Sequence, residues 1–283
     1  MRLGLTQWSH NAWQRKFYPK GCPSGDRLAR YAEVFNTVEG NTTFYASPSP
    51  ETVQRWHQAT PDHFRFTFKF PRQITHDFQL SNCRDVVSEF IHLLKPLHEK
   101  TALWKIQLPS TFGPESLGSL AQFIRALPEH CHAGVEVRHP AFFAKGEAER
   151  ALNRLLIETQ SDRIIMDSRP VFSAEPNTAA VIDAQQKKPK VPVHAIATSN
   201  SPMVRFIGHP DIEANDAFFE PWLAKIPAWL AEGKTPYLMI HTPDNDLAPE
   251  LAERLYKKVS DKLGLPKLGD LRPADNSPQF SLL

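Results

Sequence analysis

Cysteine is scarce in this 283-residue sequence, which contains Cys22, Cys83 and Cys131 and no others. Their number is odd and no two of them form a C-x-x-C pair, so neither a disulfide framework nor a zinc knuckle is indicated. We therefore expect reduced thiols, as is usual in the cytosol. No cofactor is evident from the sequence.

Long apolar runs are also lacking. No uninterrupted run approaches the roughly 20 residues that a membrane helix needs. The chain enters Leu3-Gly4-Leu5-Thr6 without the basic and then apolar pattern of an export signal. These features predict a cytoplasmic protein without a membrane partner.

The sequence has no excess of charge of one sign. Lys plus Arg number 33 and Asp plus Glu number 31, which gives a formal net charge of +2. Such a balance gives no overall electrostatic reason to expect nucleic acid or an anionic membrane as partner. Any anion-binding site must therefore be local.

What the sequence does have is a repeated alternation of strand-like and helix-like segments. The eight β-rich runs are Leu3–Gln7, Thr37–Asn41, Phe64–Phe70, Ala102–Leu108, Ala133–Arg138, Arg163–Asp167, Met203–Gly208 and Tyr237–His241. Eight alternations predict an α/β fold, a TIM (β/α)8-type barrel, as a single domain over residues 1–264. Residues 265–283 form a Pro-rich C-terminal tail in this interpretation, and Val193–Ala197 is an alternative to the seventh strand.

Side-chain alternation predicts which residues face the barrel axis. Between Phe64 and Phe70, four phenylalanines alternate with Arg65, Thr67 and Lys69. We expect the phenylalanines to pack under the helices and the polar set to point at the axis. Barrels of this kind normally fill the axis with Val, Ile and Leu, so a polar upper layer would be a departure.

Polar residues gather at the C-terminal ends of the expected strands, where these barrels place their active sites. The candidate catalytic carboxylates are Glu39 and Glu136, and the candidate ligand-binding residues are Asn41, Lys69, Gln107, Arg138, Asp167, Arg205 and His241. The alternative is a network of charge pairs that closes the barrel. Such pairs would join Glu136 to Lys105 and Asp167 to Arg205.

Several stretches carry a family resemblance, namely Gly4-x-x-x-Trp8, Phe17-Tyr18-Pro19, Phe35–Tyr45, Phe68-Lys69-Phe70-Pro71, Glu136-Val137-Arg138-His139-Pro140 and Val204-Arg205-Phe206. Together they resemble the bacterial YecE family, the domain of unknown function 72, from Met1 to about Lys257. The stretches "GVEVRHPAFFAKG" and "KKPKVPVH" are similar to the YecE branch. The resemblance implies a TIM-barrel fold and brings no established reaction. Many members have His-Gly and Asn-Asn where Ile207-Gly208 and His241-Thr242 stand here.

The first functional hypothesis is an enzyme that acts on a small anionic metabolite, phosphorylated or carboxylated. Lys69, Arg138 and Arg205 would clamp the anion, and Glu39 or Glu136 would move a proton.

Two alternatives stay open. One is a metal-dependent hydrolase, acting for example on nucleic-acid phosphodiesters, with Glu39, Glu136, Asp167 and His241 as ligands. Cations on the same strands would compete with that metal. The other is a barrel that binds a ligand without turnover.

Trp8 and the chain end add two further candidates. Trp8 could stack on a ligand or cap the barrel end by packing. The final Gln279-Phe280-Ser281-Leu282-Leu283 resembles the peptide that binds the bacterial sliding clamp. Gln279 would hydrogen-bond in one subsite while Leu282 and Leu283 fill an apolar cleft. The alternative is a tail that folds back onto the barrel.

Overall fold

The computed structural model describes residues 1–269 and 271 and confirms the (β/α)8 barrel. All eight expected strands are present, and they form a closed parallel barrel in the order β1 to β8. Their bounds are β1 Arg2–Leu5, β2 Thr37–Gly40, β3 Arg65–Lys69, β4 Thr101–Gln107, β5 Ala133–Glu136, β6 Asp162–Asp167, β7 Met203–Ile207 and β8 Tyr237–His241. Val193–Ala197, the alternative to the seventh strand, lies outside the sheet.

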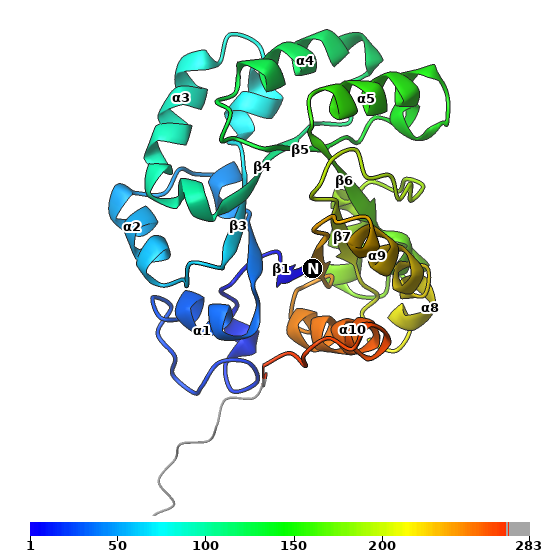
Figure 1. Ribbon diagram of the computed structural model, residues 1–283. Helices are drawn as coiled ribbons and strands as arrows, with labels where there is room; N and C mark the ends of the chain where they lie inside the picture. Colours follow the sequence, from blue (N-terminus) through cyan, green and yellow to red (C-terminus); the bar gives the residue numbers. More distant parts are fainter. Residues whose placement is uncertain (270, 272–283) are drawn as a thin grey trace, which may run out of the picture.

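The helices surround the strands (Figure 1). They are α1 Arg27–Val34, α2 Pro50–Gln58, α3 Arg84–Leu93, α4 Leu117–Ala126, α5 Glu147–Glu158, α6 Arg169–Ser173, α7 Ala179–Lys187, α8 Asn215–Phe219, α9 Trp222–Ala231 and α10 Ala248–Leu263. Short helical turns include η2 Thr42–Phe44, η3 Gln73–Asp77 and η6 Pro140–Phe143. No helix among residues 1–269 is both long and apolar enough to cross a membrane.

Local signals in the sequence account for individual helix ends. The Ser49 side chain accepts a hydrogen bond from the Thr52 N–H and caps α2, whose first residue is Pro50. At the other end of the chain, α10 stops at Gly264, which has a φ of 65°. Glycine adopts this left-handed conformation without strain.

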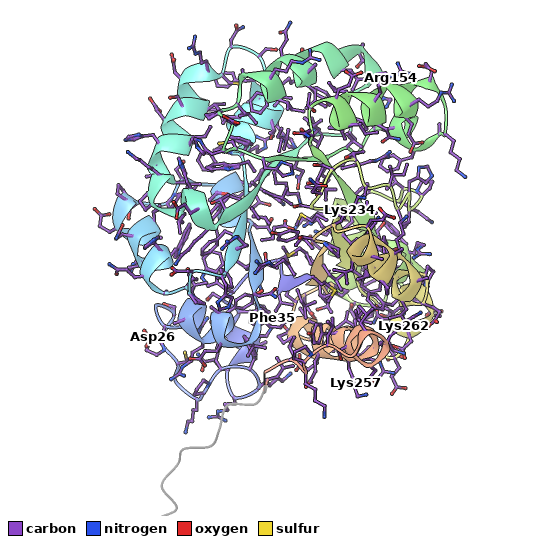
Figure 2. The ribbon with its side chains drawn as sticks, viewed as in Figure 1. Asp26, Phe35, Arg154, Lys234, Lys257 and Lys262 are labelled. Atoms are coloured by element: carbon purple, nitrogen blue, oxygen red, sulfur yellow. The ribbon has the colours of Figure 1, made fainter. Side chains whose placement is uncertain are left out.

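The outer layer of the barrel is apolar, as the alternation predicts. Phe64, Phe66 and Phe68 are fully buried and belong to the main core between strands and helices. Charged side chains of the helices, such as Arg154 and Lys257, lie at the periphery (Figure 2). The strands are therefore sandwiched between this apolar layer and the contents of the axis.

The axis itself is divided into two layers. A separate buried cluster of Leu103, Ile164, Met203, Tyr237 and Met239 fills the lower part. Two residues further along three of these strands come polar residues, Lys105 on β4, Arg205 on β7 and His241 on β8. Because side chains alternate along a strand, these residues share the inward face with the apolar plug below them.

Closure between β1 and β2 depends on Gly4. A Cβ atom at this position would lie 2.0 Å from the Thr37 carbonyl oxygen. A side chain here would push the two strands apart, and β2 carries the first carboxylate of the site.

The N-terminal end of the barrel is covered by the beginning of the expected tail. The Tyr256 hydroxyl donates to the Pro266 carbonyl oxygen at 2.9 Å, and Leu265 and Leu268 pack against the core. This contact lies at the opposite end of the barrel from the candidate site. Gln279, Leu282 and Leu283 lie outside the described residues, so clamp binding by the tail stays a prediction.

Candidate functional site

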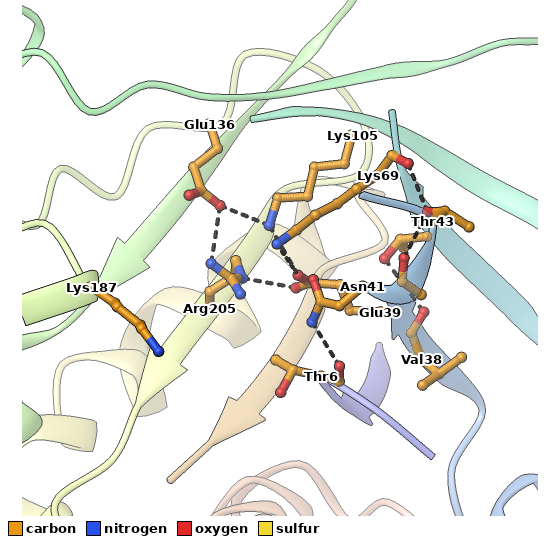
Figure 3. Close-up of polar contacts among 12 residues, drawn as sticks. Thr6, Val38, Glu39, Asn41, Thr43, Lys69, Lys105, Glu136, Lys187 and Arg205 are labelled. Carbon is orange, nitrogen blue, oxygen red and sulfur yellow. Dashed lines mark hydrogen bonds and ion pairs between the residues drawn. The ribbon is translucent and has the colours of Figure 1, made fainter. Parts of the chain in front are cut away.

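Six charged side chains meet inside the upper part of the described barrel. We call them the axial ion cluster, and its members are Glu39, Lys69, Lys105, Glu136, Arg138 and Arg205. They come from β2, β3, β4, β5, β7 and the residue two positions after β5. Figure 3 shows Glu39, Lys69, Lys105, Glu136 and Arg205 converging from different strands.

Glu39 is completely buried and contacts three cations. Its Oε2 accepts from Arg205 Nε at 2.8 Å. Its Oε1 lies 3.2 Å from Lys105 Nζ and 3.3 Å from Lys69 Nζ. Both lysines therefore share one carboxylate oxygen.

Glu136 contacts the cluster from the other side of the axis. Lys105 Nζ lies 2.7 Å from its Oε2, and Arg205 Nη1 donates to the same oxygen at 3.1 Å. Arg138 donates to Oε1 from Nη2 at 2.8 Å and from Nε at 3.1 Å. Lys105 and Arg205 thus bridge the two carboxylates. Within this set, the expected pair of Glu136 with Lys105 is present.

The parallel register brings these groups to neighbouring positions near the C-terminal ends of the strands. Lys69 pairs in register with Lys105, and Gln107 pairs with Glu136. The inward positions follow from the two-residue period of each strand. The alternation visible in the sequence therefore brings most of the candidate residues together.

The cluster holds more positive than negative charge. Its two carboxylates face two guanidinium groups and two lysines. Burial raises the pKa of Glu39, but Arg205, Lys105 and Lys69 outweigh burial and hold that pKa well below its usual value. For Glu136 the raising effect of burial is likewise outweighed by Lys105 and Arg205, so its pKa is also lowered. Both carboxylates stay ionised at neutral pH.

For the two lysines, in contrast to the two acids, the surroundings disfavour the charged form. Burial, followed by repulsion from Lys105, lowers the pKa of Lys69 well below its ordinary value. Burial and Arg205 lower the pKa of Lys105. Because guanidinium groups keep their protons, the surplus positive charge lowers the pKa of the lysines instead.

The most exposed members of the cluster are two of its cations, whereas the side chains of Lys105 and Arg205, 0% and 2% exposed, are as buried as the acids. The Arg138 side chain is 20% exposed and the Lys69 side chain 9%, whereas those of Glu136 and Glu39 are 1% and 0% exposed. A solute that approaches the cluster therefore meets positive charge first.

Lys188 is a residue that the strand pattern did not single out. It follows α7, in the Lys- and Pro-rich excursion between β6 and β7, and it is partly buried. Burial and Arg205 lower its pKa to about 8, and Glu136, Arg138 and Glu39 also influence it. The carbonyl oxygen of the adjacent Lys187 lies 3.4 Å from Arg138 Nη1, which places Lys188 near the cluster although its sequence context is that of a surface loop.

Asn41 and His241 border the cluster. Asn41 Nδ2 donates to the Thr6 carbonyl oxygen at 2.7 Å, while its buried Oδ1 has no hydrogen-bond partner within the described part of the chain. His241 Nδ1 donates to the Thr242 carbonyl oxygen at 2.6 Å. Burial, Lys188 and Arg205 lower the pKa of His241, so its imidazole is neutral.

Asp167 departs from the expected orientation. Its carboxylate is bound by Arg169, at 2.7 Å and 2.9 Å, and by Trp222 Nε1 of α9 at 2.9 Å. The pair of Asp167 with Arg205 that the sequence suggested does not form. On β6 it is Ile164 that faces the axis, so Asp167, three residues later, points to the helix layer.

Trp8 lies on the helix side of the barrel. Its ring is edge-on to Trp56 of α2, with centroids 5.1 Å apart, and to Phe66 of β3, with centroids 6.3 Å apart. This position fits the packing alternative and not stacking on a ligand in the axis.

The four residues of the metal alternative do not converge, because Asp167 faces α9 while Glu39 and Glu136 are each bound by cations. Among residues 1–269 and 271, no group of three or more His, Cys, Asp or Glu side chains is arranged to hold a metal ion.

The fold and the axial ion cluster together define a (β/α)8-barrel protein with a charged, cation-rich centre at the C-terminal ends of its strands. The chain belongs to the family described as Protein of unknown function DUF72, whose model matches residues 2–274. This confirms the family resemblance of the sequence motifs.

Relatives of known sequence and structure support the family and the fold. UPF0759 protein YecE of Escherichia coli strain K12 is 48% identical over 267 residues, which cover 94% of each chain, and the protein of the same description from strain O157:H7 gives the same values. The crystal structure of a DUF72 family protein from Enterococcus faecalis V583 has a TM-score of 0.69 at 21% identity, covering 94% of this chain and 98% of that one. A DUF72 family protein from Thermotoga maritima MSB8 also has a TM-score of 0.69, at 20% identity, covering 92% and 98%.

Proposed function

We propose that the protein is an enzyme that binds a small phosphorylated or carboxylated metabolite at the C-terminal end of the barrel. The observation that carries this proposal is the charge imbalance of the axial ion cluster, in which two carboxylates face four basic side chains. Buried charge is costly unless it is paired. An anionic ligand group would supply the missing negative charge.

Arg138, Lys69 and Lys188 are the residues that would meet the anion first. Arg138 donates to Glu136 from Nε and Nη2. Among the described residues, its Nη1 makes only a long hydrogen bond, 3.4 Å to the Lys187 carbonyl oxygen, and is the nitrogen that would bind the anion. A guanidinium group offers a planar fork that suits carboxylate and phosphate oxygens. Asn41 Oδ1, which has no hydrogen-bond partner among residues 1–269 and 271, suits a hydroxyl group on the same ligand.

In this proposal the two carboxylates do not act as general acids. Because the pKa of each is lowered, neither Glu39 nor Glu136 carries a proton to donate at neutral pH. In this proposal they hold Lys105 and Arg205 in place and stabilise positive charge that develops near them. The neutral His241 imidazole is then the better candidate for moving a proton.

Sulfate is a suitable probe because it remains a dianion across the physiological pH range. We expect sulfate to raise the midpoint of thermal unfolding of the wild-type protein in a saturable manner, since a ligand of the folded state stabilises it by mass action. Sodium chloride at matched ionic strength corrects for screening. Arg138→Ala should weaken the sulfate effect about tenfold or more in apparent affinity, consistent with the loss of a charge-assisted contact.

Arg150→Ala is the matched control, because Arg150 is 62% exposed and pairs with Glu147 on the outer surface of α5. This variant should respond to sulfate as the wild type does. A wild-type protein that shows no response beyond that to chloride, or an Arg138→Ala variant that binds sulfate normally, would contradict the anion site.

A further inference from the structure

We propose that Lys69 is a nucleophilic amine that forms an imine with the carbonyl group of the anionic substrate. This inference rests on the proposed anion site and narrows the substrate class to small aldehydes or ketones that carry a carboxylate or a phosphate. Glu39, in contact with Lys69, would stabilise the cationic product.

The charge count of the axial ion cluster supports a neutral Lys69. Arg138 and Arg205 keep their charge at any physiological pH and already balance the two carboxylates. Lys69 and Lys105 share one oxygen of Glu39, at 3.3 Å and 3.2 Å, so a proton on both would place two positive charges beside one oxygen. A lysine beside another cation in a buried site is activated in this way. The lowered pKa of Lys69, caused by burial and by Lys105, agrees with this arrangement.

Position distinguishes Lys69 from Lys105. The Lys105 side chain is fully buried and contacts both carboxylates, whereas the Lys69 side chain is 9% exposed and contacts Glu39 alone among the acidic groups of the cluster. Lys69 is the last residue of β3, at the open end of the barrel. Its Nζ lies 5.6 Å from the centre of the Phe44 ring, which covers one side of the amine.

The step conserves atoms and charge without a further reactant. The nitrogen lone pair of Lys69 attacks the carbonyl carbon, and a carbinolamine forms. Loss of the carbonyl oxygen as water, with uptake of one proton, leaves a C=N bond whose nitrogen is positively charged. Glu39 Oε1 is 3.3 Å from that nitrogen and would offset its charge. Arg138 or Lys188 would bind the carboxylate or phosphate of the same molecule.

Reductive trapping tests the imine in the intact protein. Glyoxylate with sodium cyanoborohydride should convert Lys69 to carboxymethyl-lysine, because hydride adds to the C=N bond, and glycolaldehyde phosphate should trap the same residue if a phosphate is accepted. Peptide mapping by mass spectrometry would locate the product. Each unit by which the pKa is lowered raises the neutral fraction of an amine about tenfold, so Lys69 should be labelled at least about tenfold faster than ordinary lysines.

Four controls give the experiment its specificity. Lys100 is a buried lysine outside the cluster that donates to the His57 and Thr60 carbonyl oxygens, and it should stay unlabelled. Acetaldehyde, which has no anionic group, should label Lys69 several-fold more slowly than glyoxylate, and sulfate should slow labelling by glyoxylate. Lys69→Arg replaces the amine with a guanidinium group, which forms no imine under these conditions, so labelling at position 69 should be lost.

The outcomes separate this inference from the anion site. Sulfate binding without labelling of Lys69 would overturn the imine and leave the anion site standing. Labelling of Lys69 at equal rates by glyoxylate and acetaldehyde would support the amine and contradict the anion site. Labelling confined to exposed lysines would overturn the imine irrespective of how any variant folds.

Discussion

At the scale of single residues, the surplus of cations makes the members of the axial ion cluster unequal. Each carboxylate binds three basic groups, so the loss of one acid leaves several buried cations without compensation. The loss of one lysine removes a cation that was in excess. Stability and ligand binding therefore place opposite demands on Lys69.

Glu39→Gln and Lys69→Met test this inequality. We expect Glu39→Gln to lower the free energy of unfolding by about 3–5 kcal/mol, because it leaves Lys105 and Arg205 partly unpaired in the interior. Lys69→Met should be neutral or stabilising in the absence of a ligand, since a methionine of similar shape removes a buried amine that competes with Lys105 for one oxygen of Glu39. Urea unfolding followed by circular dichroism gives both values.

Glu147→Gln is the control for an exposed acid, because Glu147 is 69% exposed and pairs with Arg150. Its effect should stay within about 1 kcal/mol. Equal losses of stability in Glu39→Gln and Lys69→Met would show that the cluster carries no surplus of positive charge.

At the scale of structural elements, the sequence was informative where one face of a strand is polar. The alternation of β3 fixes the inward position of Lys69 and the outward position of Phe68, because only one assignment buries the phenylalanines. On β6 both faces are apolar around Ile164 and Ile165. Such a strand is buried on both sides, and its sequence has no alternation of polar and apolar residues that would show which face is inward. The outward direction of Asp167 could therefore not be predicted.

The excursion between β6 and β7 was unpredictable for another reason. The Lys- and Pro-rich part of its sequence has no hydrophobic periodicity, and its path is set by side-chain contacts between residues far apart in the sequence. His194 Nδ1 lies 2.5 Å from Glu149 Oε1 of α5, and the same oxygen accepts from Arg163 Nη1 at 2.9 Å. Ser168 Oγ donates to the Pro189 carbonyl oxygen at 2.8 Å. These contacts hold the segment that positions Lys188.

His194→Ala should therefore loosen the excursion without unfolding the barrel. Loss of the contact to Glu149 should speed tryptic cleavage after the exposed Lys190 by about tenfold, because local opening replaces global unfolding as the route to cleavage. Gel electrophoresis and mass spectrometry would give the rate and the site.

His132→Ala is the matched control. His132 makes a similar contact, 2.6 Å from Nε2 to Asp162 Oδ2, at the first residue of β6. Cleavage after Lys190 in this variant should match the wild type. If His194→Ala were cleaved no faster than this control, the contact to Glu149 would not hold the excursion.

At the scale of the whole molecule, the net charge of +2 says little about function, because the opposing charges are unevenly distributed. Exposed pairs on the helices contribute little to stability, whereas Glu39 and Glu136 are enclosed by the barrel. In the closed barrel, β2 and β5 bring these acids to Arg205 on β7. The stability of the entire fold is therefore linked to the protonation of two groups.

Acid should consequently unfold the protein through this cluster. The pKa of both Glu39 and Glu136 is lowered in the folded state relative to the ordinary value of 4.5. A lowered pKa stabilises the folded protein above pH 4.5, and this stabilisation is lost as the pH falls toward the folded-state pKa, because the unfolded chain binds protons first. Each acid should contribute a slope of up to about 1.4 kcal/mol per pH unit in that window.

Urea unfolding at a series of pH values between about 5.5 and 3 measures this slope, since the pKa of both buried acids is lowered in the folded state. The wild-type protein should lose stability steadily below pH 4.5, and Glu136→Gln should lose it less steeply, because one of the two linked groups is gone. Glu147→Gln, with its exposed carboxylate, should keep the wild-type slope. A wild-type stability that stays constant from pH 5.5 to 3 would mean that the cations do not hold the two carboxylates ionised, and the charge balance from which anion binding and the reactive amine are inferred would be wrong with it.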